Sequence, residues 1–188
     1  STTNETREFV YEIIRNSELP MVIDADALTL VADNPKILNE AKAEIVLTPH
    51  PGEMSRLARI STEEVQANRI EVALDFSTRY NVYLVLKGAR SVISTPQGEI
   101  FINTTGNAGM ASGGMGDILT GIIGGLLAQR IEPADACTLG VFAHGLAGDL
   151  AAEQSGEAGI IASDVANKLP NAIRKIPKMD DNFITKIR

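Results

Sequence analysis

The stretch Asn103-Thr-Thr-Gly-Asn-Ala-Gly-Met-Ala-Ser-Gly-Gly-Met-Gly-Asp117 places five glycines within residues 106–116 and runs straight into an apolar segment with helical character. Glycine tolerates positive φ and lets the backbone approach a ligand closely. The N–H groups at the start of the following helix, together with the helix dipole, form a site for phosphate oxygens. The spacing matches neither G-x-x-x-x-G-K-[ST] nor G-x-G-x-x-G, which disfavours a P-loop and a dinucleotide-binding fingerprint.

Asp117 is the first acidic residue within this positive environment. An aspartate at such a position commonly caps the helix. It can also act as a general base that takes the proton of a substrate hydroxyl while the N–H groups hold a transferring phosphoryl group. The spacing alone leaves the two roles open.

Outward from this stretch, short apolar segments alternate with predicted helices. Residues 21–23, 45–47 and 83–86 are predicted strands that are apolar throughout, and 92–93 with 100–101 predict a hairpin. Predicted helices cover 2–16, 27–32, 35–41, 61–80, 117–129, 133–153 and 163–176. Such alternation predicts an α/β fold whose mostly parallel sheet carries helices on both faces. We expect a single domain over 1–188, with a frayed tail at 177–188.

Polar residues follow three of the predicted strands. Asp24 and Asp26 come after the first, the turn Pro49-His-Pro-Gly-Glu53 after the second, and Lys87-Gly88 after the third. Ligands of open parallel sheets bind beyond the carboxyl ends of the strands. These three strand ends and the glycine-rich stretch are therefore the candidate site.

Composition excludes several classes of function. The formal charge of −7 and the pI near 4.9 argue against a nucleic-acid partner. One cysteine and two histidines cannot make an internal disulfide, a cysteine-rich zinc site or a three-histidine zinc centre. The longest apolar stretch, 118–128, is far shorter than the roughly 20 residues that span a bilayer. We expect a soluble cytoplasmic protein.

The segment Asn107–Asp117 resembles the signature of the ADP/ATP-dependent NAD(P)H-hydrate dehydratases, a family of the ribokinase-like superfamily. Segments 22–28, 47–53 and 86–91 are similar to three further segments of that family, in the same order, and 140–149 also fits. The resemblance implies a ribokinase-like fold. It also implies that the N-terminal βα units of the domain, which line part of the substrate pocket, are missing here.

The resemblance implies a repair reaction in which hydrated NADH or NADPH (NADHX, NADPHX) is phosphorylated on its ring hydroxyl by ADP, or by ATP, and then loses phosphate. Asp117 would be the catalytic base and, with His50, would contact the hydrated dinucleotide. The adenine nucleotide would be held by Lys87, Gly88, Ala89, Arg90, Ser91 and Gly116, and the anion hole would consist of Gly113, Gly114, Met115 and Gly116. Asn107 and Glu53 are additional candidates.

The family also implies Mg²⁺ dependence, with no metal ligand assigned, and a homo-oligomer, with a tetramer as the suggested size. Three of the candidate site residues also have a structural explanation. His50 can be a surface turn residue, and Lys87 can be an edge lysine that extends to solvent. Glu53 can be a helix cap or a water-mediated magnesium ligand. Gly121, Gly124 and Gly125 are expected to permit close helix packing.

Two rival functions remain at this point. One is a ribokinase-like kinase of a small alcohol, such as hydroxyethylthiazole or a sugar, which would stop after phosphoryl transfer. The other is a nucleotide-sensing domain without catalysis.

Overall fold

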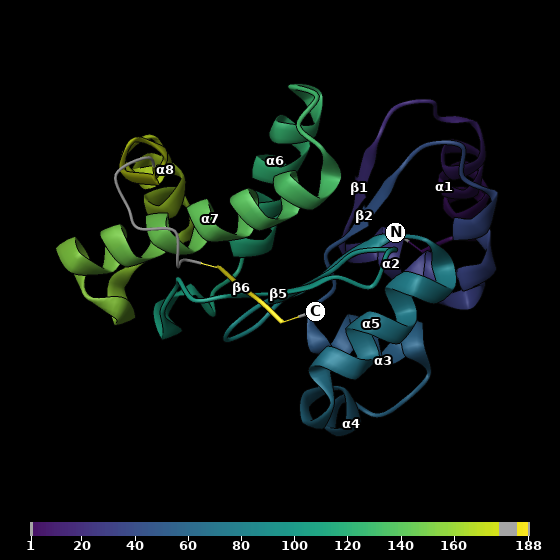
Figure 1. Ribbon diagram of the computed structural model, residues 1–188, viewed down its shortest axis with the longest axis horizontal. Helices are drawn as coiled ribbons and strands as arrows, with labels where there is room; N and C mark the ends of the chain where they lie inside the picture. Colours follow the sequence, from purple (N-terminus) through teal and green to yellow (C-terminus); the bar gives the residue numbers. More distant parts are fainter. Residues whose placement is uncertain (1, 177–183, 188) are drawn as a thin grey trace. The chain divides into compact units, whose positions relative to one another are not determined.

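The computed structural model describes residues 2–176 and 184–187. The chain divides into two compact units (Figure 1). One comprises residues up to 88 together with 92–100, and the other comprises 89–91 and 101–187. Each unit is described by itself.

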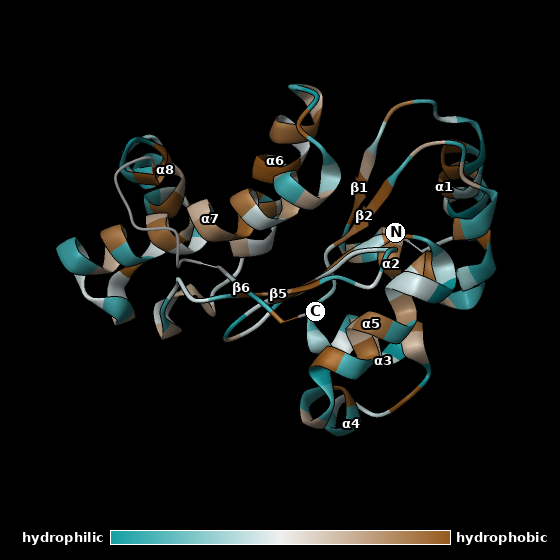
Figure 2. Ribbon diagram, viewed as in Figure 1, coloured by the Kyte–Doolittle hydropathy of each residue, from teal (hydrophilic) through white to brown (hydrophobic). Residues whose placement is uncertain are grey.

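The first unit contains a mixed sheet. Strands β1 (Met21–Ile23), β2 (Ile45–Leu47) and β3 (Tyr83–Leu86) run parallel, and β4 (Val92–Ser94) pairs antiparallel with β3. Every residue of β2 and β3 is buried, which explains why these strands are apolar throughout rather than alternating. Figure 2 shows β1 and β2 as hydrophobic ribbons. The predicted α/β fold with a largely parallel sheet is confirmed for this unit.

The helices of this unit follow the strands. They are α1 (Asn4–Asn16), α2 (Ala25–Asp33), the 3₁₀ helix η1 (Pro35–Glu40), α3 (Pro51–Ala58), α4 (Thr62–Ala67) and α5 (Arg69–Tyr80). Helix α5 packs against β3 and β4.

These helices differ from the prediction in two places. The turn after β2 continues as helix α3, which lies outside the predicted helices. The single helix predicted over 61–80 is broken at Asn68, whose side-chain amide donates to the Glu64 carbonyl at 3.2 Å. A short amide side chain that binds the preceding turn in this way competes with the helical ladder.

The second unit is mainly helical. It contains α6 (Met115–Ala128), α7 (Pro133–Ser155) and α8 (Ala162–Lys175), with the 3₁₀ turns η2 (Ala108–Met110) and η3 (Glu157–Gly159). Helix α7 packs against both α6 and α8. Its core joins Ala147 and Ala151 of α7 to Met115, Ile160 and Val165.

Strand β5 (Ile100–Asn103) pairs antiparallel with β6 (Ile184–Lys186). Most of the tail expected to fray, 177–183 and 188, lies outside the described residues. Among the described residues of that tail, 184–186 form a strand with β5 as the partner, and the frayed tail stays a prediction.

Close packing between α6 and α7 depends on a different glycine from those expected. A Cβ at Gly121 or Gly125 of α6 would meet nothing within 4 Å in the described part of the chain. A Cβ at Gly140 of α7 would lie 2.8 Å from Ile123 Cγ1. The expectation that the α6 glycines permit close packing is therefore wrong at 121 and 125. None of the described helices is both long enough and apolar enough to span a membrane.

Candidate functional site

The carboxyl ends of β1, β2 and β3 bring three charged side chains together in the first unit. Lys87 Nζ lies 2.8 Å from Asp24 Oδ1 and 3.8 Å from Glu53 Oε2. Their side chains are only 19%, 11% and 9% exposed, respectively. Parallel strands end at the same edge of a sheet, so residues far apart in sequence meet here. Lys87 thus faces two carboxylates, and the alternative of an edge lysine extended to solvent is not what the structure shows.

His50 and Glu53 form a reciprocal cap at the start of α3. His50 Nδ1 accepts hydrogen bonds from the N–H groups of Gly52 at 3.0 Å and Glu53 at 3.3 Å, and Glu53 Oε2 accepts from the His50 N–H at 2.7 Å. Because Nδ1 is an acceptor, a neutral His50 carries its proton on Nε2, which lies 3.5 Å from Glu53 Oε1. Glu53 therefore has the capping role that the sequence left open for it, and His50 is the N-cap of α3 rather than a simple turn residue.

The turn after Lys87 is fixed by Arg69, which was not predicted as a site residue. Arg69 donates to the carbonyl oxygens of Leu86 at 3.0 Å and Lys87 at 3.4 Å, and burial lowers the pKa of its guanidinium. Gly88 has φ +140°, and a Cβ there would lie 3.0 Å from Arg69 Nη1. Only glycine fits this position without strain. An arginine at the start of a surface helix gives no sequence signal for such a role.

The other residues predicted to hold the nucleotide, Ala89, Arg90, Ser91 and Gly116, belong to the second unit. Arg90 has φ +55°, and the Ser91 carbonyl accepts from the Asn103 N–H at 3.0 Å. The predicted segment 87–91 thus crosses the division between the units.

The first half of the glycine-rich stretch is bound into the second unit. Asn107 Oδ1 accepts from the Gly109 N–H at 3.1 Å, and Asn107 Nδ2 donates to Asp149 Oδ1 at 3.0 Å. The Gly106 N–H donates to Asp149 Oδ2 at 2.9 Å. A Cβ at Gly109 would lie 2.1 Å from the Glu157 carbonyl oxygen. Asn107, an additional candidate for the site, therefore shapes the loop through contacts within it and with α7.

The second half of the stretch is open. No described atom lies within 4 Å of the Cβ position of Gly113, and Gly114, with φ +84°, begins α6 without a cap from any described side chain. The Met115 N–H donates to the Ser112 carbonyl at 3.4 Å. This N–H group is therefore less available to bind a phosphate than the predicted anion hole requires. The N–H groups of Gly116 and Asp117 lie in the first turn, where the helix supplies no acceptor. Neither forms a hydrogen bond elsewhere in the described residues.

Asp117 does not cap its helix. It occupies the third position of α6, where Glu53 of α3 and Asp164 of α8 each reach back to accept the N–H of their cap residue, at 2.7 and 3.0 Å. The Asp117 carboxylate is exposed and has no hydrogen bond or ion pair with any described residue. The capping alternative is excluded in this conformation, and the carboxylate remains available next to uncapped N–H groups.

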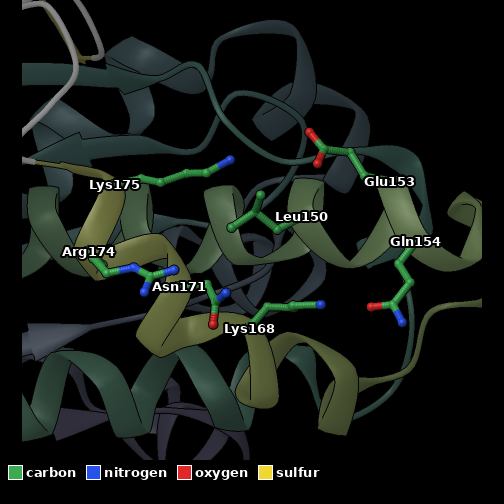
Figure 3. Close-up of a pocket in the computed structure, with 7 residues that line it drawn as sticks. All are labelled: Leu150, Glu153, Gln154, Lys168, Asn171, Arg174 and Lys175. Atoms are coloured by element: carbon green, nitrogen blue, oxygen red, sulfur yellow. The ribbon is translucent and has the colours of Figure 1, made fainter.

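Two cavities lie away from these residues. One of about 360 Å³, between α7 and α8, is lined by Leu150, Glu153, Gln154, Lys168, Asn171, Arg174 and Lys175 (Figure 3). Another, of about 530 Å³, lies among η1, α3 and α5. Neither contains a predicted site residue. The described residues also contain no group of three His, Cys, Asp or Glu side chains that could hold a metal ion.

Known proteins match this chain over most of its length. The family model described as NAD(P)H-hydrate dehydratase matches residues 2–171. The bifunctional NAD(P)H-hydrate repair enzyme Nnr of Thermofilum pendens is 45% identical over 92% of this chain and 33% of its own. The ADP-dependent (S)-NAD(P)H-hydrate dehydratase of Neisseria meningitidis is 37% identical over 82% of this chain and 53% of its own.

The structural comparison agrees. The ADP/ATP-dependent NAD(P)H-hydrate dehydratase of Bacillus subtilis, co-crystallized with ATP/Mg²⁺ and soaked with CoA, has a TM-score of 0.82 at 29% identity. The match covers 93% of this chain and 62% of that structure. This chain therefore spans about a third of the bifunctional relative and roughly half to three-fifths of the dehydratases. With a family model over nearly the whole chain and a shared ribokinase-like fold, the chain belongs to the NAD(P)H-hydrate dehydratase family.

Proposed function

We propose that this chain carries the phosphoryl-transfer machinery of an ADP-dependent dehydratase that restores NADH and NADPH from their hydrates. One observation carries the proposal. Asp117 presents an exposed carboxylate in the first turn of α6, beside main-chain N–H groups, and no described residue pairs with the carboxylate or caps those N–H groups. A base and an anion site side by side are what phosphoryl transfer to a hydroxyl requires.

In the first step Asp117 takes the proton of the ring hydroxyl as the hydroxyl oxygen attacks the β-phosphorus of ADP. The bond from phosphorus to the bridging oxygen breaks, and AMP leaves. The N–H groups of Gly113, Gly114 and Gly116 stabilise the charge on the phosphoryl oxygens. In the second step the ring carbon–oxygen bond breaks, phosphate leaves with the electron pair, and loss of a ring proton restores the double bond.

His50 would contact the hydrated dinucleotide through its Nε2–H, since Nδ1 is committed to the cap of α3. Lys87 would contact the nucleotide, with its ammonium oriented by Asp24 and Glu53. These assignments are proposals that the local geometry supports within the first unit.

The described residues do not fit a dedicated Mg²⁺ cage. No cluster of three candidate ligands exists among them, and the Asp24 and Glu53 carboxylates already face Lys87. Mg²⁺ commonly binds through substrate phosphates, its own waters and one or two carboxylates. We propose that the ion enters with the nucleotide. That the protein forms a homo-oligomer, with a tetramer as the suggested size, stays a prediction that sedimentation analysis can test.

The experiment mixes the intact protein with NADHX and either ADP or ATP and follows the reduced-nicotinamide absorbance band. The expected result with ADP is recovery of absorbance with one AMP and one inorganic phosphate per NADH. Faster turnover with ATP would show that ATP is the preferred phosphoryl donor, and the proposed dehydration of NADHX would stand. A stable phosphorylated product without recovery of absorbance would show a kinase and overturn the proposal.

A further inference from the structure

One face of α7 serves as a platform for the first half of the glycine-rich stretch. Thr105 Oγ1 donates to the Phe142 carbonyl at 3.0 Å, and Thr105 lies so close to Gly145 that a Cβ there would be 2.2 Å from Thr105 Oγ1. Met110 Sδ would be equally close to a Cβ at Gly148. Positions 142, 145 and 148–149 follow the three- and four-residue spacing of a single helix face. The loop therefore lies directly on this face of α7.

Asp149 is the charged residue of that face. Its two carboxylate oxygens accept separately, Oδ2 from the Gly106 N–H and Oδ1 from Asn107 Nδ2. Asn107 extends the chain by accepting from the Gly109 N–H. No described lysine or arginine forms an ion pair with Asp149, which is partly buried. Within the described residues its charge is thus stabilised by donors of the loop, and hydrogen bonds to a carboxylate are among the stronger kinds in proteins.

This arrangement divides the donors of the loop. The Gly106 N–H donates to Asp149, and the Gly109 N–H donates to Asn107. The N–H groups of Gly116 and Asp117, in contrast, have no acceptor in the described chain. A phosphate is therefore directed to the end of the stretch. The start of the stretch is held at a fixed place on α7.

We propose that Asp149 is a positioning residue for the anion-binding turn 113–117, acting through Asn107. The inference rests on the proposed function, because it assigns phosphate to that turn. Asp149 does not touch the substrate. By holding 106–110 on α7, it fixes the point from which 111–117 extends, and displacements of about 1 Å at a reacting centre can cost a hundredfold in rate.

An exchange of the two side chains tests this without changing the composition. In Asp149→Asn, the new amide places an N–H₂ group against Asn107 Nδ2 or against the Gly106 N–H, so two donors face each other. In Asn107→Asp, two carboxylates face each other. In the double variant Asn107→Asp/Asp149→Asn, the carboxylate at 107 accepts from the Gly109 N–H and from the amide at 149, whose oxygen accepts from the Gly106 N–H. All three hydrogen bonds can form again.

We expect each single variant of the intact protein to lose about tenfold to a hundredfold in kcat, more than any change in KM for ADP. The double variant should regain most of that loss. Unfolding temperature is measured alongside. If the single variants lose stability but keep kcat at a temperature where all are folded, or if the double variant is no better than the singles, Asp149 is only structural and the inference is wrong.

A second measurement separates this inference from the proposed function. Amide hydrogen exchange at Met115 and Ile118, whose N–H groups donate to the Ser112 and Gly114 carbonyls at 3.4 and 3.2 Å, reports the order of the turn without any turnover. Faster exchange in both single variants and recovery in the double variant support positioning even if the wild-type protein proves to have no dehydratase activity. Unchanged exchange in the single variants would contradict the inference even if the dehydratase activity is present.

Discussion

The contact between α7 and the glycine-rich stretch predicts the effect of Gly145→Ala. The new Cβ would lie 2.2 Å from Thr105 Oγ1 and 2.8 Å from the Thr105 carbonyl carbon, whereas an ordinary contact begins at 3.4 Å. Thr105 Oγ1 must therefore retreat by about 1.2 Å or α7 must move away. Because one of the clashing atoms is main chain, side-chain rotation alone cannot relieve the contact.

The cost can be assembled from its parts. Overpacking costs about 1–3 kcal/mol, and loss of the Thr105–Phe142 hydrogen bond costs about 1 kcal/mol. The gain in helix propensity from glycine to alanine returns about 1 kcal/mol. We expect a net loss of about 2 kcal/mol, or about 4–8 °C in unfolding temperature for a chain of this size.

The assay combines thermal unfolding with turnover of NADHX. Gly121→Ala is the matched control, since it makes the same chemical change in a helix where the Cβ position is open. We expect Gly145→Ala to lower both stability and kcat, because the loop that leads to Asp117 is displaced. If Gly145→Ala is as stable and as active as wild type, the packing of Thr105 on α7 is not what fixes this loop.

Three further predictions concern other parts of the molecule. Gly121→Ala itself should stabilise the protein by about 0.5–1 kcal/mol through the entropy of the unfolded chain, measured by denaturant unfolding, and a destabilised variant would reveal a neighbour at that position. Asp24→Asn keeps the cap of α2 but removes the charge beside Lys87, so we expect the free energy of unfolding to fall by about 1–2 kcal/mol and the KM for ADP to rise. The control Asp75→Asn removes an ion pair of the same 2.8 Å length whose side chains are about 60% exposed, and should lower the free energy of unfolding by under about 0.5 kcal/mol. Burial raises the pKa of the Cys137 thiol, so above about pH 8.5 the folded protein keeps a proton that the unfolded chain releases. The free energy of unfolding should therefore fall above that pH by up to about 1.4 kcal/mol per pH unit. Cys137→Ala should remove that slope, and an equal slope in both proteins would contradict the assignment.

The strands of the first unit were predictable because their burial leaves a direct record in sequence. Residues 21–23, 45–47 and 83–86 are apolar throughout and form β1, β2 and β3 within those bounds. Helix α3 was not predictable in the same way, because His50 is an unusual cap and a proline at 51 is as typical of a turn as of a helix start. The break at Asn68 depends on one side-chain hydrogen bond, which periodicity does not reveal.

The candidate site was predictable where a motif is local. The open end of the glycine-rich stretch and the exposed Asp117 follow from glycine spacing and helix position. Arg69 and Asp149 were not predicted as site residues, because each acts on a segment 17 or more residues away in sequence. Whether Glu53 or Asp117 caps its helix also depends on local side-chain conformation that the spacing leaves open.

The central claim is that Asp117 is the base of phosphoryl transfer. The most direct measurement compares kcat for NADHX and ADP in Asp117→Asn with that in Asp135→Asn, which alters an exposed aspartate at the same third position of α7. The account predicts a loss of about 10²–10⁴-fold in kcat for Asp117→Asn, with nucleotide affinity retained, and near wild-type turnover for Asp135→Asn. Turnover of Asp117→Asn within a few fold of wild type would contradict it.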